Sequence, residues 1–126
     1  MAYFHVWFVT KYRKTILEGK VSRRLKNIFA ECIERHKYNV LELETNRDHL
    51  HLLLETKDKT ELSAIVRTLK AVSAKELNGT PRFRVGNASF RRSFWARRYG
   101  SREIGENQIE DIREYIRNQD TTGGSL

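Results

Sequence analysis

The chain has 126 residues, of which 39% are hydrophobic and 32% are charged, and it carries a formal net charge of +8. This length suits one domain with a buried core, and no run of about 20 apolar residues predicts a membrane span. The positive charge favours a polyanionic partner, most often nucleic acid, although a soluble protein can also simply be basic. We expect no signal peptide. Because the single cysteine, Cys32, cannot form an internal disulfide, we also expect a cytoplasmic location.

The first predicted element is a strand over residues 3–10, which are β-branched and aromatic and contain no breaker. Such a run predicts burial on both faces, and it favours His5 as a packed strand residue over a metal ligand. A basic tip with an aromatic residue inside it follows, formed by Lys11, Tyr12, Arg13 and Lys14. This combination suits single-stranded nucleic acid, but a solvated strand end would have the same composition.

Two helices are predicted from apolar residues that recur at helical spacing. The first covers residues 21–37, with Cys32 on its apolar face as a core thiol. His36 lies near its end, where the helix dipole favours a cation. The second helix begins at Thr60, a candidate N-cap, and ends near Gly79.

Between these helices, residues 38–45 and 49–55 predict the two strands of an antiparallel hairpin, joined by the polar turn 46–48. In the second strand, His49 and His51 share one face, because alternate residues of a strand point the same way. Two imidazoles at this spacing can bind one metal ion, although solvated or hydrogen-bonded histidines would show the same pattern. The other face carries three leucines that point into a core, Leu50, Leu52 and Leu54.

Residues 81–99 form the most basic and aromatic part of the chain, and 94–96 predicts the last strand of the sheet. Six arginines alternate here with five aromatic residues, which is more than core packing requires. The segment therefore favours a nucleic-acid-binding surface over a strand that only needs aromatics for its core. The arginines are Arg82, Arg84, Arg91, Arg92, Arg97 and Arg98.

The last part of the chain predicts a glycine-flanked hinge linker over residues 100–106 and a third helix over 107–119, which begins with a capping asparagine. Residues 120–126 are expected to form a frayed tail. Tyr115 and Gln119 are four residues apart on the helix and are therefore neighbours on its surface.

The resulting order is strand, helix, strand, strand, helix, strand, helix. The first six elements match the split β-α-β arrangement of ferredoxin-like folds. We therefore predict an α+β fold, with a ferredoxin-like antiparallel sheet and helices on one face in residues 1–99, plus a C-terminal helix that carries Tyr115. This fold hosts many functions and does not identify one by itself.

Four segments of the chain resemble the small single-tyrosine transposases of the HUH superfamily (the TnpA type), which move minimal insertion sequences through single-stranded DNA. The resemblance extends from about Tyr3 to Gln119 and implies one HUH transposase domain over residues 1–126. The four segments are FVTKYR at 8–13, NRDHLHLL at 46–53, FWARRY at 94–99 and YIRNQ at 115–119.

The resemblance implies that Tyr115 is the nucleophile and forms a 5′-phosphotyrosine, leaving a free 3′-hydroxyl. It also implies that His49, His51 and Gln119 bind a divalent metal, Mg²⁺ or Mn²⁺. Two imidazoles suit Mn²⁺ better than Mg²⁺, which prefers an all-oxygen shell. If Tyr115 were not the nucleophile, Tyr99 would be the next candidate.

The resemblance further implies a homodimer, in which the tyrosine helix of one subunit completes the site of the other and Gly100 and Gly105 form the hinge. It implies a single-stranded DNA substrate that is recognised through a hairpin. Clustering of charge, rather than a motif, then assigns hairpin phosphates to Arg82, Arg84, Arg91 and Arg92. Clustering likewise assigns DNA near the site to Lys11, Arg13 and Lys14, and further DNA contacts to Arg97 and Arg98.

Two other classes of protein remain open at this point. One is a domesticated or replication-initiator-like HUH endonuclease, which would use the same chemistry in another biological role. The other is a non-catalytic ferredoxin-like nucleic-acid-binding module, which would leave the histidines, Tyr115 and Gln119 without a purpose.

Overall fold

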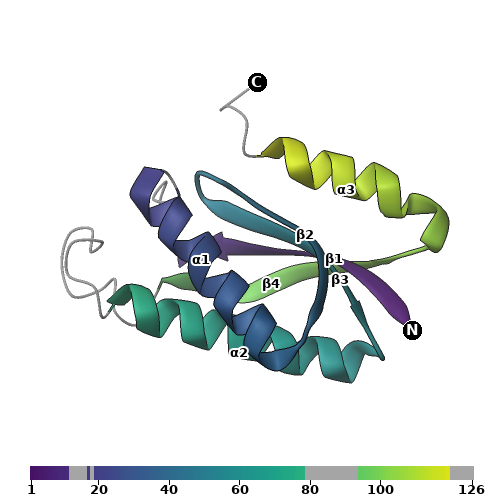
Figure 1. Ribbon diagram of the computed structural model, residues 1–126, viewed down its shortest axis with the longest axis horizontal. Helices are drawn as coiled ribbons and strands as arrows, with labels where there is room; N and C mark the ends of the chain where they lie inside the picture. The colour runs from purple at the N-terminus through teal and green to yellow at the C-terminus, as the bar shows by residue number, and fades with distance from the viewer. Residues whose placement is uncertain (12–16, 18, 79–93, 120–126) are drawn as a thin grey trace.

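The computed structural model describes residues 1–11, 17, 19–78 and 94–119 (Figure 1). Within these residues the helices and strands follow the predicted order, with one additional 3₁₀ helix before the last helix, and the other differences concern where the elements begin and end. They are β1 (Ala2–Thr10), α1 (Gly19–His36), β2 (Asn39–Asn46), β3 (His49–Thr56), α2 (Lys59–Asn78), β4 (Trp95–Ile104), the 3₁₀ helix η4 (Glu106–Gln108) and α3 (Ile109–Arg117).

The four strands form one antiparallel sheet in the order β2-β3-β1-β4, which confirms the predicted ferredoxin-like arrangement. β2 and β3 form the predicted hairpin, and its turn places Arg47 at a φ of 44°. The backbone amide of Thr10 donates to the carbonyl oxygen of Asp48 at 2.8 Å. The amide of Leu17 donates to the carbonyl oxygen of Arg47 at 2.7 Å. These bonds fix the hairpin tip, which immediately precedes His49.

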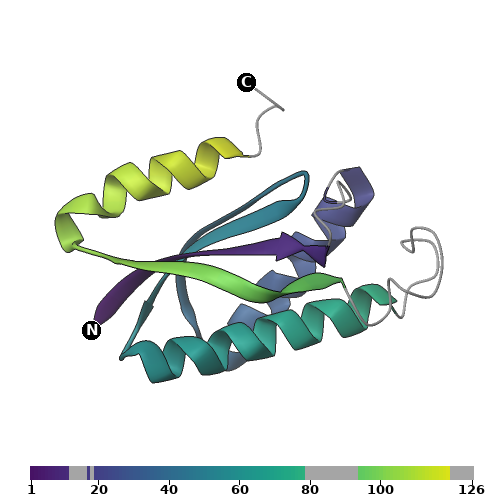
Figure 2. The ribbon, with the colours of Figure 1, turned by 180° about the vertical axis from the view of Figure 1, so that it is seen from behind.

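α1 and α2 cover one face of the sheet, which we call the core face (Figures 1 and 2). Apolar residues that alternate along β1 and β3 are buried there, because every second side chain of a strand points the same way. Leu50, Leu52 and Leu54 are fully buried, as the sequence predicts. Cys32 of α1 is also buried in this core, and burial raises the pKa of its thiol, so it is a packing residue.

α3 crosses the opposite face of the sheet, which we call the outer face, and contacts β2 and β3 (Figure 2). A second apolar cluster holds it there, formed by the buried side chains of Leu53, Ile104 and Ile116. The helix covers only part of the outer face, since Trp7 and Val9 of β1 are half-buried. The prediction that this strand is buried on both faces is therefore wrong at these two positions and at Tyr3, which is also half-buried.

The predicted hinge linker is shorter than expected. Residues 100–104 belong to β4 and pair with β1, with Gly100 opposite Trp7 and Ile104 opposite Tyr3. Glycine and serine favour a linker locally, but the ladder to β1 supplies partners for their backbone groups. Only Gly105 and η4 remain between the sheet and α3.

The helix starts also differ from the sequence expectation. Helix α2 begins at Lys59, and the Asp58 carboxylate, rather than Thr60, accepts a hydrogen bond from the Glu61 amide at 2.9 Å. Ahead of α3, the Gly105 amide donates to the side chain of Gln108 at 2.9 Å, so the expected asparagine cap is replaced. In the described part of the chain, no helix is both long and apolar enough to cross a membrane.

Candidate active site

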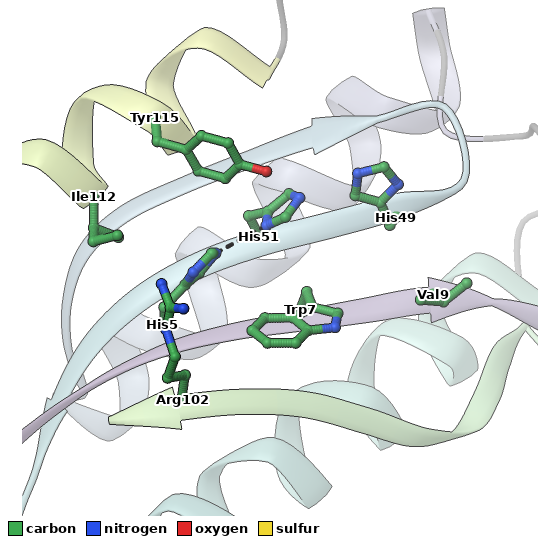
Figure 3. A pocket seen from close by; sticks show the side chains of 8 residues that line it. All are labelled: His5, Trp7, Val9, His49, His51, Arg102, Ile112 and Tyr115. Carbon is green, nitrogen blue, oxygen red and sulfur yellow. Dashed lines mark hydrogen bonds between the residues drawn. The ribbon is translucent and has the colours of Figure 1, made fainter. Parts of the chain in front are cut away.

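A cleft of ≈ 540 Å³ opens on the outer face, beside the part that α3 covers (Figure 3). Its walls come from four elements that are far apart in the sequence. The lining residues are His5, Trp7 and Val9 of β1, His49 and His51 of β3, Arg102 of β4, and Ile112 and Tyr115 of α3.

The two histidines of β3 stand side by side in this cleft, as their spacing predicts. Their ring centroids are 4.7 Å apart. His51 is only 6% exposed, whereas the side chain of His49 is 24% exposed. One imidazole therefore lies at the bottom of the cleft and the other nearer its mouth.

A carboxylate orients the imidazole of His49. Nδ1 of His49 donates a hydrogen bond to Oδ1 of Asp48 at 2.6 Å. A neutral imidazole has one protonated nitrogen, so this bond places the proton on Nδ1 and leaves the lone pair on Nε2. A ligand histidine held in this way by a carboxylate is the common arrangement around bound metal ions.

A third histidine orients His51. Nδ1 of His51 lies 3.0 Å from Nε2 of His5, and the two rings are stacked with centroids 5.2 Å apart. Nε2 of His51 is buried and has no hydrogen-bond partner among the described residues. A buried nitrogen without a partner is costly, and a bound ion would satisfy it. If that nitrogen carries the lone pair, Nδ1 of His51 is protonated and donates a hydrogen bond to Nε2 of His5.

Burial sets the charge of this histidine cluster. It lowers the pKa of His51 to about 3, with smaller contributions from the positive charge that His49 and His5 can carry. Burial also lowers the pKa of His5, and the Arg102 guanidinium lowers it further. Both rings are therefore neutral at neutral pH, which is the form that binds a metal ion.

The sequence did not reveal the position of His5 beside His51 in the cleft. His5 is buried, as predicted for a packed strand residue, but its ring also supports a site histidine. Strand alternation places His5 on the same face as Trp7 and Val9. The contact with His51 depends on the register between β1 and β3, which pairs His5 with Leu53 and which a single strand does not show.

Tyr115 extends from α3 over the histidines. Its ring centroid lies 5.7 Å from that of His51 and 5.8 Å from that of His5, both edge-on. The side chain is half exposed, and its hydroxyl points into the cleft above His51 (Figure 3). Tyr99, the other tyrosine considered as a nucleophile, packs against the core-face cluster and lies 3.5 Å from the Ser63 hydroxyl of α2.

Gln119 lies two residues beyond the end of α3, which is shorter than the predicted helix 107–119, and it is not among the residues that line the cleft. Its Nε2 donates to the carbonyl oxygen of Tyr115 at 3.3 Å, and its Oε1 accepts from Nδ2 of Asn46 at 3.3 Å. Asn46 pairs with His49 across the hairpin, so the amide of Gln119 is near the site but is held by a neighbour. Among the described residues, no group of three or more His, Cys, Asp or Glu side chains is arranged to hold a metal ion.

Of the nine basic residues predicted to bind DNA, three are in the described part of the chain. Lys11 follows β1, whereas Arg97 and Arg98 are exposed on β4. The other six lie outside the described residues: Arg13, Lys14, Arg82, Arg84, Arg91 and Arg92. Arg102, which the sequence placed in a linker, is an additional cation at the cleft itself.

The chain is similar to known transposases over most of its length. The family described as "Transposase IS200 like" matches residues 1–119. The transposase for insertion sequence element IS200 of Salmonella typhimurium is 32% identical over 119 residues, which cover 92% of this chain and 75% of that protein. The ISDra2 transposase TnpA of Deinococcus radiodurans is 27% identical over 117 residues, which cover 92% and 82%.

Two solved structures have a similar fold. A candidate transposase from Deinococcus radiodurans R1 superposes with a TM-score of 0.71 at 25% identity, covering 97% of this chain and 94% of that one. A REP-associated tyrosine transposase bound to a REP hairpin superposes with a TM-score of 0.68 at 14% identity, covering 99% and 69%. At that low identity the second likeness shows the fold alone.

Proposed function

Since this chain belongs to the family of IS200-like transposases, we propose that it cleaves and rejoins single-stranded DNA at the ends of an insertion sequence through a 5′-phosphotyrosine. The observation that carries the proposal is the placement of one tyrosine hydroxyl over two oriented imidazoles. Tyr115 comes from α3 and the imidazoles from β3, so the sheet and the helix together form the site.

The proposed reaction is a transesterification at phosphorus. The Tyr115 oxygen forms a bond to the scissile phosphorus while the bond from phosphorus to the 3′-oxygen breaks. The phenol gives up its proton to water, and the departing 3′-oxygen takes one up. Attack by a 3′-hydroxyl on the phosphotyrosine reverses these steps and joins two strands. Each step exchanges one phosphoester bond for another, so no ATP is needed.

A phenol has a pKa near 10 and is a weak nucleophile at neutral pH, so the phosphate has to be activated and held in place. We propose that His49 and His51 do this by holding a divalent ion, Mg²⁺ or Mn²⁺, through their Nε2 atoms, with Gln119 as a third ligand. When bound, the ion polarises the scissile phosphate and neutralises charge that develops on it.

The described residues fit such an ion. Asp48 leaves a lone pair on Nε2 of His49, and the buried Nε2 of His51 has no other partner among them. The fit is less complete for Gln119, whose Oε1 accepts from Asn46 and would have to exchange that bond for the ion. Two imidazoles favour Mn²⁺ on ligand grounds.

The proposed substrate is single-stranded DNA that the protein recognises through a hairpin. The net charge of +8 and the exposed arginines of β4 support a polyanionic ligand. The basic residues outside the described part of the chain, such as Arg82 and Arg84, stay candidates for hairpin phosphates on the basis of their clustering.

We also propose a homodimer in which α3 can act on either subunit. Within one chain, α3 lies on its own sheet, with Tyr115 near its own His51. A mixture of a Tyr115→Phe protein and a His49→Ala protein tests for exchange, since neither variant alone has a complete site. Restored cleavage would show that the helix acts in trans, whereas an inactive mixture would confine it to its own sheet.

The cleavage proposal is tested with hairpin oligonucleotides from the ends of the gene's own element, incubated with Mn²⁺ or Mg²⁺. The readout is a covalent protein–DNA band on a denaturing gel. The band should require metal and should disappear in the Tyr115→Phe and His49→Ala proteins. A Tyr99→Phe protein is the matched control, because that hydroxyl lies across the sheet from the cleft. Binding without any covalent band would instead indicate a non-catalytic nucleic-acid-binding module.

A further inference from the structure

Trp7 has an unusual position for a large apolar side chain. It belongs to neither of the two buried apolar clusters formed by the described residues. It is half-buried on the outer face, in the part of the sheet that α3 leaves open. Packing of the core therefore does not explain why this position carries an indole.

The neighbouring strand makes room for the indole. Gly100 of β4 lies directly opposite Trp7 in the ladder. A Cβ atom at Gly100 would lie 2.0 Å from Cε2 and 2.1 Å from Nε1 of the indole. The ring is therefore packed over the bare backbone of β4, and any other residue at position 100 would displace it. Gly100 thus fixes Trp7 in place. The sequence suggested that Gly100 is part of a hinge, whereas the structure places it within β4.

The indole also belongs to the catalytic cleft. It lines the cleft together with His49, His51 and Tyr115, and in Figure 3 it lies on the floor beside the histidines. The His5 ring contacts it with a centroid distance of 5.1 Å. A strand that presents its phosphate to Tyr115 therefore brings an adjacent base close to the indole.

We propose that Trp7, supported by Gly100, is a stacking platform for an unpaired nucleobase next to the scissile phosphate. Every base has an aromatic face, so such a platform holds single-stranded DNA without reading its sequence. Arg102, at the rim of the same cleft, supplies a cation for the adjoining phosphate. The inference rests on the proposed function, because it places the scissile phosphate at Tyr115.

Stacking on an aromatic side chain strengthens binding by about 5- to 150-fold per base. We therefore expect Trp7→Ala to weaken binding of a single-stranded oligonucleotide that spans the cleavage site by this factor. Binding is measured with the Tyr115→Phe protein so that no covalent product forms. Trp7→Phe should retain part of the affinity, because phenylalanine keeps an aromatic face.

An abasic scan of the oligonucleotide shows whether a base contacts the indole. One abasic position flanking the scissile phosphate should weaken binding to the protein that carries Trp7. The same abasic position should have no effect on Trp7→Ala, because the partner is already absent. If the abasic loss and the Trp7→Ala loss simply multiply, the two groups do not interact and the proposal is overturned.

Tryptophan fluorescence gives a test that does not depend on the fold of Trp7→Ala. The only other tryptophan, Trp95, is 6% exposed, and its Nε1 donates to Ser73 at 2.9 Å. We expect the oligonucleotide to quench the emission of Trp7, and the Trp7→Phe protein to lose that quenching. Unchanged quenching in Trp7→Phe would overturn the platform.

Different experimental results would contradict the stacking platform and the cleavage proposal. Covalent product that forms equally well in Trp7→Phe and Trp7→Ala, without quenching in the parent protein, overturns the platform and leaves cleavage intact. Quenching that requires Trp7, without any covalent band, supports the platform and counts against cleavage.

Discussion

Replacing Ile116 by alanine tests how the tyrosine helix is held on the sheet. Ile116 is fully buried between α3 and the outer face, in one cluster with Leu53 and Ile104. The change removes about three methylene-sized groups at roughly 0.8 kcal/mol each, or about 2.4 kcal/mol before any cavity term. Since 1.4 kcal/mol is tenfold, the ratio of docked to undocked α3 should fall by about 50-fold or more.

Amide hydrogen exchange measures this ratio element by element. We expect the amides of α3 to lose protection by about that factor, while those of β1 and β3 keep theirs, because the core-face cluster is untouched. Cleavage should decrease in parallel, since Tyr115 precedes Ile116. Glu114→Ala is the matched control, because this side chain is exposed on the same helix. Unchanged protection of α3, or an equal loss in every strand, would refute the reasoning.

Three further changes test other parts of the site. Glu42→Gln should lower the amide protection of α3 in low salt, because Glu42 accepts hydrogen bonds from Arg117 at 2.7 and 3.2 Å. The same change should have little effect in about 1 M salt, because the pair is partly exposed and salt screens its charges. Gly100→Ala should lower the free energy of unfolding by roughly 1–3 kcal/mol in a denaturant titration, because its Cβ overlaps the indole. His5→Phe should weaken Mn²⁺ binding by about 10- to 100-fold in calorimetry, because His51 loses the partner that orients it.

Each of these predictions has its own control and its own contrary outcome. Glu31→Gln makes the same charge change at an exposed position of α1, and an equal effect there would show that the Glu42–Arg117 ion pair does not hold α3. Ser101→Ala adds no new Cβ to β4, so a similar loss of stability would show that the strand, and not the indole, is sensitive. His36→Phe changes a histidine at the end of α1, and a comparable loss of Mn²⁺ affinity would make the effect of His5 nonspecific.

The sequence predicted those parts of the fold that depend on periodicity. Alternation in β3 assigned Leu52 to the core and His51 to the other face, and the structure confirms both. Helical spacing similarly placed Cys32 on the apolar face of the first helix, and the residue lies in the core-face cluster. These patterns are local, since burial of one face imposes a period of two on a strand and of 3.6 on a helix.

The parts that the sequence missed depend on contacts between distant segments. Residues 100–104 contain glycine and serine and so resemble a linker, but pairing with β1 makes them a strand. The same register brings Arg102 to the cleft and Gly100 beneath Trp7. The role of His5 likewise requires the position of β3 beside β1. The register between strands is set by the assembled sheet, and the separate strand patterns do not specify it.

The two faces of the sheet separate stability from chemistry. Neither Tyr115 nor any histidine that lines the cleft belongs to the core-face cluster. Among the described residues, the packing that stabilises the sheet therefore does not depend on the residues of the site. The histidines lie on the two inner strands, where neighbours on both sides fix them. Tyr115 instead lies on a helix that is held by a small apolar cluster and by the ion pairs of Glu42 with Arg113 and Arg117.

This difference bears directly on the proposed exchange of α3 between subunits. A helix fixed by an extensive core could leave its sheet only if the domain unfolded. In the proposed exchange, the small apolar cluster under α3 would let the helix detach while the histidine half of the site stays in place. Exchange then requires only that α3 bind an identical outer face on the partner, where the same cluster and the same ion pairs can form again.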